Sequence, residues 1–135
     1  MTRTVTSDEF VTLILATLKL RHGDIDLLDA DLDRGLQDAY EDLSLQENSL
    51  RISSNFTFFP DPLHGNSTKL RRAILWARDR GFLESKQDKR DTKYHVSMSD
   101  QLASRFLNGA AIGQGFLDCV VAHRFPMLRN TEAAA

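Results

Sequence analysis

The chain has 135 residues, of which 41% are hydrophobic and 27% charged, and its formal net charge is −2. This length and composition predict one globular domain that buries a core without metals or disulfides, and the single cysteine, Cys119, excludes an internal disulfide framework. The longest apolar stretch, residues 10–20, is too short to span a bilayer, and the first residues lack the apolar run of a signal peptide. We therefore expect a cytoplasmic domain over residues 1–129, followed by a frayed tail over residues 130–135.

A first helix is predicted to begin at Thr6 and to end at Gly23. Thr6 and Glu9 have the spacing of a capping box, in which a hydroxyl and a carboxylate satisfy the first free backbone N–H groups of a helix. Gly23 supplies a residue that adopts a positive φ without strain, as helix ends require. Apolar residues lie on several sides of this helix, so we expect it to be central in the domain or to lie at an interface.

A second helix is predicted over residues 29–47, with a stripe of leucines and many acids. The acids at the start of the helix resemble positions 1, 3 and 5 of a calcium-binding loop, but Arg34 and Tyr40 occupy the places of the required Gly and Glu. A solvated acidic helix face is therefore the prediction, without a bound metal. The acids are Asp29, Asp31, Asp33, Asp38, Glu41 and Asp42.

Residues 50–59 are predicted to form a strand, because three phenylalanines suit a strand better than a helix. Pro60 and Pro62 end it, and turn residues up to Ser67 lead into a third helix. The strand and its turn separate the second and third helices by about twenty residues.

The third helix, residues 67–80, is amphipathic and basic. On a helical wheel of about 100° per residue, one side is apolar and faces the core: Leu70, Ala73, Ile74 and Ala77. The first two turns present Thr68, Lys69, Arg71 and Arg72 away from that side. Arginine donates two hydrogen bonds to guanine and a helix N-terminus attracts phosphate, so this face suits the DNA major groove. The alternative is a solvated amphipathic helix without a partner.

A β-ribbon is predicted after this helix. Residues 93–98 alternate between apolar and polar side chains, which is the period of a half-buried strand. The preceding turn gathers four cations, Lys86, Lys89, Arg90 and Lys93. Residues 1–66 hold 5 basic and 12 acidic residues, whereas residues 67–135 hold 12 basic and 7 acidic. A polyanion would therefore bind one face of the molecule.

Residues 67–98 resemble the recognition helix and wing of a winged helix-turn-helix domain of the MarR and PadR type. The Gly-Phe-Leu-Glu step at residues 81–84, the charged turn at 88–91 and the strand at 94–99 carry the resemblance. It implies an α+β, predominantly helical, winged-helix-like fold with four main helices and a β-ribbon wing at residues 85–93. It also implies that Lys89 and Arg90 contact the minor groove or phosphates. The sequence departs from the family in the long connection before the third helix, where the family has a short turn.

The last helix is predicted from residue 99 to Phe125 and ends before Pro126. Gly109 and Gly113 weaken its middle, so it either kinks or divides into two helices. The same two glycines allow close helix packing, against a second copy of the chain or against the first helix. A homodimer through the first and last helices is the expected oligomer.

Other chemistry has little support in the sequence. Cys119 and His123 share a helix face, but no second pair completes a zinc site, and a packed cysteine beside a surface histidine is predicted instead. Neither a nucleophile motif nor a glycine-rich phosphate loop is present. We therefore expect no enzymatic activity, no catalytic residue, no metal and no cofactor.

The sequence thus predicts a DNA-binding transcriptional regulator whose helix 67–80 enters the major groove of double-stranded DNA, with the ribbon tip on the backbone or in the minor groove. The predicted DNA contacts are Thr68, Lys69, Arg71, Arg72, Lys86, Lys89, Arg90 and Lys93. The alternative is a winged-helix-like protein-interaction module, such as an antitoxin or a complex subunit, that does not bind DNA. It would bind its protein partner through the acidic second helix or through Phe56, Phe58 and Phe59.

Overall fold

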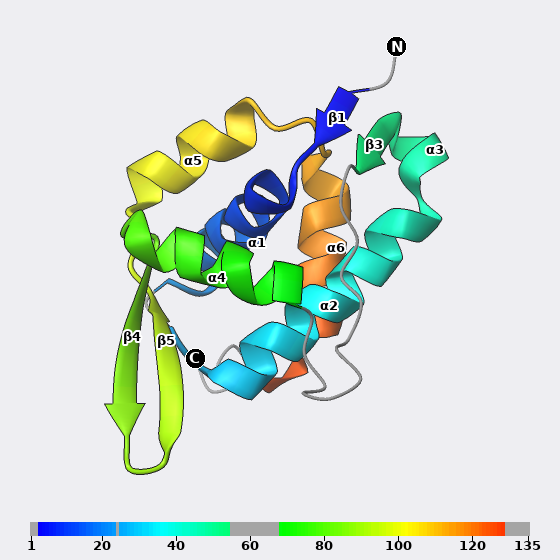
Figure 1. Ribbon diagram of the computed structural model, residues 1–135. Coiled ribbons are helices and arrows are strands. Elements are labelled where there is room, and N and C mark those ends of the chain that lie inside the picture. The colour runs from blue at the N-terminus through cyan, green and yellow to red at the C-terminus, as the bar shows by residue number, and fades with distance from the viewer. Residues whose placement is uncertain (1–2, 24, 55–67, 129–135) are drawn as a thin grey trace.

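A computed structural model describes residues 3–23, 25–54 and 68–128 of the chain, which adopt an α+β fold (Figure 1). Helix α1, Ser7–His22, lies at the centre, and every residue from Phe10 to Leu18 is buried. Helices α4, α5 and α6 pack against it. Of the two places expected for this helix, the structure favours the central one, because its own chain covers it.

The predicted helix start at Thr6 and end at Gly23 are confirmed, and of the predicted capping box the structure shows the bond to the Thr6 hydroxyl. The Thr6 hydroxyl accepts a hydrogen bond from the Glu9 backbone N–H at 3.1 Å, and Gly23 adopts a φ of 74°. Two buried threonines, Thr12 and Thr17, donate their hydroxyls to backbone carbonyls four residues earlier, at 2.7 and 2.9 Å. These bonds satisfy both hydroxyls, which allows polar side chains to lie within the apolar core.

Helix α2, Asp29–Leu45, packs against α6, and a short helix, α3, Glu47–Leu50, follows it. Strand β3, Ile52–Ser54, then pairs in parallel with β1, Arg3–Val5. The helix predicted over residues 29–47 is therefore confirmed, except that α2 ends at Leu45. The predicted strand is confirmed only over β3, and its remaining residues lie outside the described part of the chain.

A three-stranded antiparallel sheet contains the predicted ribbon. Strands β4, Leu83–Asp88, and β5, Asp91–Val96, form a hairpin, and β2, Asp26–Leu28, adds to the free edge of β5. The sheet order is therefore β2-β5-β4. Figure 1 shows the hairpin extending away from the helices at the end where α4 finishes.

The last predicted helix is two helices, α5, Asp100–Asn108, and α6, Gln114–Arg124, followed by a 3-10 turn at Pro126–Leu128. Gly109 caps the end of α5 and Gly113 caps the start of α6. The predicted division of the last helix at these glycines is therefore confirmed. A Cβ added at Gly109 would meet only the Arg105 carbonyl at 4.0 Å, and one at Gly113 would meet no atom within 4 Å, so the predicted close packing against the first helix through these glycines is wrong. Their packing against a second copy of the chain stays a prediction.

The expected α+β, predominantly helical class is confirmed, although the described residues hold six α-helices and not four main ones. The two additional helices come from the short α3 and from the division of the last helix into α5 and α6. Among the helices of the described ranges, none combines the length and the apolar character that a membrane crossing requires.

Candidate nucleic-acid interface

Helix α4, Thr68–Asp79, presents the predicted apolar face to the core. Its four buried residues are Leu70, Ala73, Ile74 and Ala77. The helix ends at Gly81, whose φ is 83°, and the Phe82 N–H donates back to the Ala77 carbonyl at 2.9 Å. This pair of features is the Schellman ending, which needs a glycine at the left-handed position. The ending turns the chain directly into β4.

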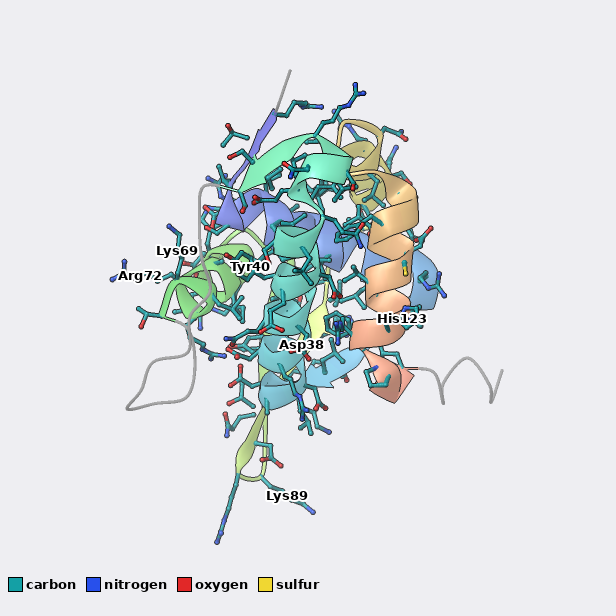
Figure 2. The ribbon with its side chains drawn as sticks, turned by 90° about the vertical axis from the view of Figure 1, so that its right-hand side faces the viewer. Asp38, Tyr40, Lys69, Arg72, Lys89 and His123 are labelled. Carbon is teal, nitrogen blue, oxygen red and sulfur yellow. The ribbon has the colours of Figure 1, made fainter. Side chains whose placement is uncertain are left out.

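The opposite face of α4 is polar and exposed at its N-terminal end. Thr68, Lys69 and Arg72 are all exposed, and Figure 2 shows Lys69 and Arg72 pointing away from the body of the molecule. Within the described ranges, neither cation lies within ion-pair distance of an acid. Both charges are therefore available to an anionic partner.

Arg71 lies on a different side of the helix from Arg72. Its guanidinium Nη1 lies 2.6 Å from Asp29 Oδ1 and 3.5 Å from Asp33 Oδ2, so it joins α4 to the start of α2. Partial burial opposes the charge of Arg71, but the hydrogen bond and the charge of Asp29 prevail and raise its pKa. The structure therefore separates Arg71 from the outward residues with which the sequence grouped it.

The hairpin tip carries two further exposed cations. Lys89 and Arg90 form the two-residue connection between Asp88 and Asp91, which are paired in the last register position. Lys89 has a φ of 58°, in the left-handed region, where a side chain costs about 1 kcal/mol relative to glycine. Figure 2 places Lys89 at the far end of the hairpin. Neither tip residue contacts an acid within the described part of the chain.

Lys86 and Lys93 lie nearer the base of the hairpin, opposite each other in the strand register. Lys86 Nζ lies 3.9 Å from Asp26 Oδ1, and His95 Nδ1 lies 2.8 Å from the same oxygen. Lys86 thus has an acidic neighbour, and Lys93 is only partly exposed. We define the basic surface as Thr68, Lys69, Arg72, Lys89 and Arg90. Lys86 and Lys93 lie beside it and are not counted in it.

Three of the six acids of α2, Asp29, Asp33 and Asp42, form ion pairs inside the molecule. Asp33 is 5% exposed, and burial raises its pKa against the opposing effect of Arg71. Near the other end of the helix, Asp42 accepts two hydrogen bonds of 2.7 Å from Arg124 on α6, and this side-chain bond raises the Arg124 pKa. The predicted solvated acidic face is therefore wrong for Asp33. Figure 2 shows Asp38 on the same helix, between these two charged contacts.

Cys119 and His123 share a face of α6, as predicted, but Cys119 is exposed and not packed. His123 Nδ1 lies 2.8 Å from the Cys119 carbonyl oxygen and 3.5 Å from its sulfur, so the carbonyl is the nearer partner. The described residues contain no group of three or more His, Cys, Asp or Glu side chains that are placed to hold a metal. The aromatic segment with Phe56, proposed for a protein partner, lies outside the described residues.

Comparison with models of protein families, with curated proteins and with solved structures finds no match for this chain. The basic surface is therefore defined by its own contacts. Two signals in the sequence located it, the helical period of α4 and the cations of the hairpin turn. The role of Arg71 had no such signal, because its partners lie about forty residues earlier in the chain.

Proposed function

We propose that this chain is a cytoplasmic winged-helix DNA-binding transcriptional regulator, with α4 in the major groove and the β4–β5 tip on the backbone or in the minor groove. One observation carries the proposal. Lys69, Arg72, Lys89 and Arg90 are exposed and have no acidic partner among the described residues, whereas the neighbouring Arg71 is held inside by two aspartates. A surface with unpaired cations on a helix and a ribbon is complementary to a phosphate backbone.

The order of the elements supports this proposal. The helix pair α2 and α4 is followed at once by a two-stranded ribbon, which combines the helix-turn-helix and wing arrangements. The long connection after α2 departs from that family pattern. Its described part, α3 and β3, lies at the end of the molecule opposite the hairpin tip (Figure 1), so it leaves the outward face of α4 uncovered.

Each residue of the basic surface has a chemical role in the proposal. Arg72 donates two hydrogen bonds to guanine O6 and N7 in the major groove. Lys69 and Thr68 contact phosphates beside the N-terminus of α4, where the helix dipole adds positive potential. Lys89 and Arg90 neutralise phosphates or enter the minor groove from the hairpin tip. The strained φ of Lys89 supports a functional need for a cation at that place.

We retain a homodimer in this proposal, but the surface that forms it changes. Helix α1 is buried by its own chain, so it has little surface left for a second copy. Partly buried apolar residues of α5, of its connection to α6 and of the start of α6 offer a larger one, and they are Leu102, Leu107, Ala111 and Phe116. Sedimentation equilibrium measures whether the purified chain is a dimer.

The experiment is fluorescence anisotropy of a labelled mixed-sequence duplex at low salt. We expect wild-type protein to bind, and the triple variant with Arg72, Lys89 and Arg90 changed to Ala to lose most of the affinity. A matched control changes Arg3 and Arg34 to Ala and Arg51 to Asn, because Asn tolerates the φ of 57° at Arg51. This control removes the same charge away from the basic surface. The proposal is rejected if wild type does not bind, or if both triple variants bind equally.

A further inference from the structure

Two adjoining hollows lie between α1, α4 and α5. One has a volume of about 520 Å³ and the other about 610 Å³, and Asp8 and Trp76 line both. Volumes of this size are typical of small-molecule sites. Because the hollows share two side chains, we treat them as one feature, the α1–α4–α5 groove.

The first hollow begins at the basic surface. Thr68, Lys69 and Arg72 line it, and all three come from the first turns of α4. Two cations that are three residues apart on a helix lie on neighbouring positions of one side, so both reach a single bound group. Together with the hydroxyl of Thr68 and the positive end of a twelve-residue helix, they suit a phosphate.

Trp76 lies where the two hollows join. Its ring is held edge to face against Phe82, with centroids 5.8 Å apart and an interplanar angle of 71°. The Arg80 guanidinium carbon lies 5.2 Å from the indole centroid. The ring is thus fixed in place and only partly buried, and Arg80 lies over one of its faces, so a planar aromatic molecule in the groove stacks on the other face.

The second hollow adds carboxylates to this cationic and aromatic lining. Asp8 and Glu9, from the first turn of α1, both line it, and neither carboxylate forms an ion pair with a described residue. An ionised carboxylate only accepts hydrogen bonds, so it favours a ligand that donates them. A simple aromatic acid brings no such donors, whereas ribose hydroxyls and base amino groups do.

We propose that the α1–α4–α5 groove binds a nucleoside monophosphate. Its phosphate binds Lys69 and Arg72, its base stacks on Trp76, and its hydroxyl or amino groups donate to Asp8 and Glu9. Because the phosphate occupies the two cations assigned to DNA, bound nucleotide weakens DNA binding. That competition rests on the proposed function, whereas nucleotide binding itself does not.

Trp76 is the only tryptophan of the chain, so its fluorescence reports this groove alone. Adenosine monophosphate is titrated into the protein with excitation at the long-wavelength edge of indole absorption, where adenine does not absorb. We expect a saturable change in emission, with weaker binding for adenosine or inorganic phosphate alone. A change that does not saturate at millimolar nucleotide overturns the proposal.

Matched double variants locate the phosphate. Changing Lys69 and Arg72 to Ala raises the half-saturating concentration about tenfold or more, because two charge-assisted hydrogen bonds are lost. Changing Lys89 and Arg90 to Ala removes the same charge from the hairpin tip and leaves the titration unchanged. Equal titrations for the two variants overturn the proposal. Glu9→Gln tests the carboxylate that lines the second hollow alone, with an expected weakening for adenosine monophosphate.

The DNA measurement separates this inference from the proposed function. Wild-type protein is tested against the labelled duplex with and without adenosine monophosphate, and the nucleotide is expected to raise the apparent Kd for DNA. A saturable fluorescence change without DNA binding rejects the proposed function and retains the nucleotide site. DNA binding without the fluorescence change rejects the nucleotide site alone.

Discussion

Helices α2 and α4 are both highly charged, and they direct their charges in opposite ways. Three acids of α2 form ion pairs inside the molecule: Asp29 and Asp33 pair with Arg71, and Asp42 pairs with Arg124. On α4, Lys69 and Arg72 face solvent without an acidic partner among the described residues. The difference teaches that a count of charges does not identify a binding surface. The partners of each charge decide which helix is free to bind another molecule.

Two adjacent arginines of α4, Arg71 and Arg72, show the same difference between a paired and an exposed charge. Arg71 and Arg72 are separated by about 100° around the helix. One joins α4 to α2, and the other points away from the protein (Figure 2). Substituting each arginine in turn therefore compares an inward and an outward charge of the same residue type at neighbouring positions.

The largest expected effect separates these two arginines. Arg71→Ala leaves the buried carboxylate of Asp33 without its cation, so the free energy of unfolding falls by about 2 kcal/mol. Arg72→Ala changes it by less than about 0.5 kcal/mol but weakens duplex binding about tenfold. Urea unfolding and anisotropy measure the two quantities. Equal losses of stability, or a larger loss for Arg72→Ala, would contradict this division of roles.

The second prediction concerns the inward face of α2. A Cβ at Gly35 would lie 2.5 Å from Cε1 of Phe125, whose ring is buried. Gly35→Ala therefore forces α2 and the end of α6 apart, and should lower the free energy of unfolding by about 2 kcal/mol. Gly115→Ala is the control, because no atom lies within 4 Å of its added Cβ, and this helical position should gain up to about 1 kcal/mol. A neutral Gly35→Ala would show that α2 does not pack as described.

A third, smaller effect is expected at the hairpin tip. Lys89→Gly removes the strain of a φ of 58° and should raise the free energy of unfolding by about 1 kcal/mol, while weakening duplex binding. Arg90→Gly removes the same charge at a residue without a positive φ, so it should give no such gain. If both variants have the same stability, strain at Lys89 is not a feature of the tip.

The smallest effect is a pH dependence from Asp33. Burial raises its pKa in the folded protein, so the native state binds a proton more readily than the unfolded chain does. This contribution to stability is present below the unfolded pKa and is lost as pH rises through the raised value. The free energy difference between Asp33→Asn and wild type should therefore shift in favour of the variant as pH rises from the acid range. A shift in the opposite direction would mean that Arg71 dominates over burial.

Local patterns in the sequence predicted much of the fold. Helical spacing identified the core face of α4, and the Thr6 capping box located the start of α1. Strand alternation identified β5, and the turn residues located the hairpin tip. These features depend on neighbours within a few residues, which is why a single sequence is sufficient to predict them.

Features that depend on distant partners were missed. Strand β2 has three residues, too few to show a period, and it exists because β5 offers a free edge. The helical wheel placed Arg71 beside the outward residues, because a wheel describes one helix only and does not include Asp29 of α2. Gly109 and Gly113 predicted the division of the last helix correctly, but the close packing against the first helix that they also suggested is not found, since an added Cβ at Gly113 would meet no atom within 4 Å.

The central claim is that Lys69, Lys89 and Arg90, which have no acidic partner among the described residues, bind the phosphates of DNA. The most direct measurement is the slope of log K against log salt for duplex binding by wild type, Lys69→Ala, Lys89→Ala and Arg34→Ala. We expect a steep negative slope for wild type, reduced by about one unit for each of the first two variants and unchanged for Arg34→Ala. Absence of binding at low salt, or a slope that only Arg34→Ala reduces, would contradict the claim.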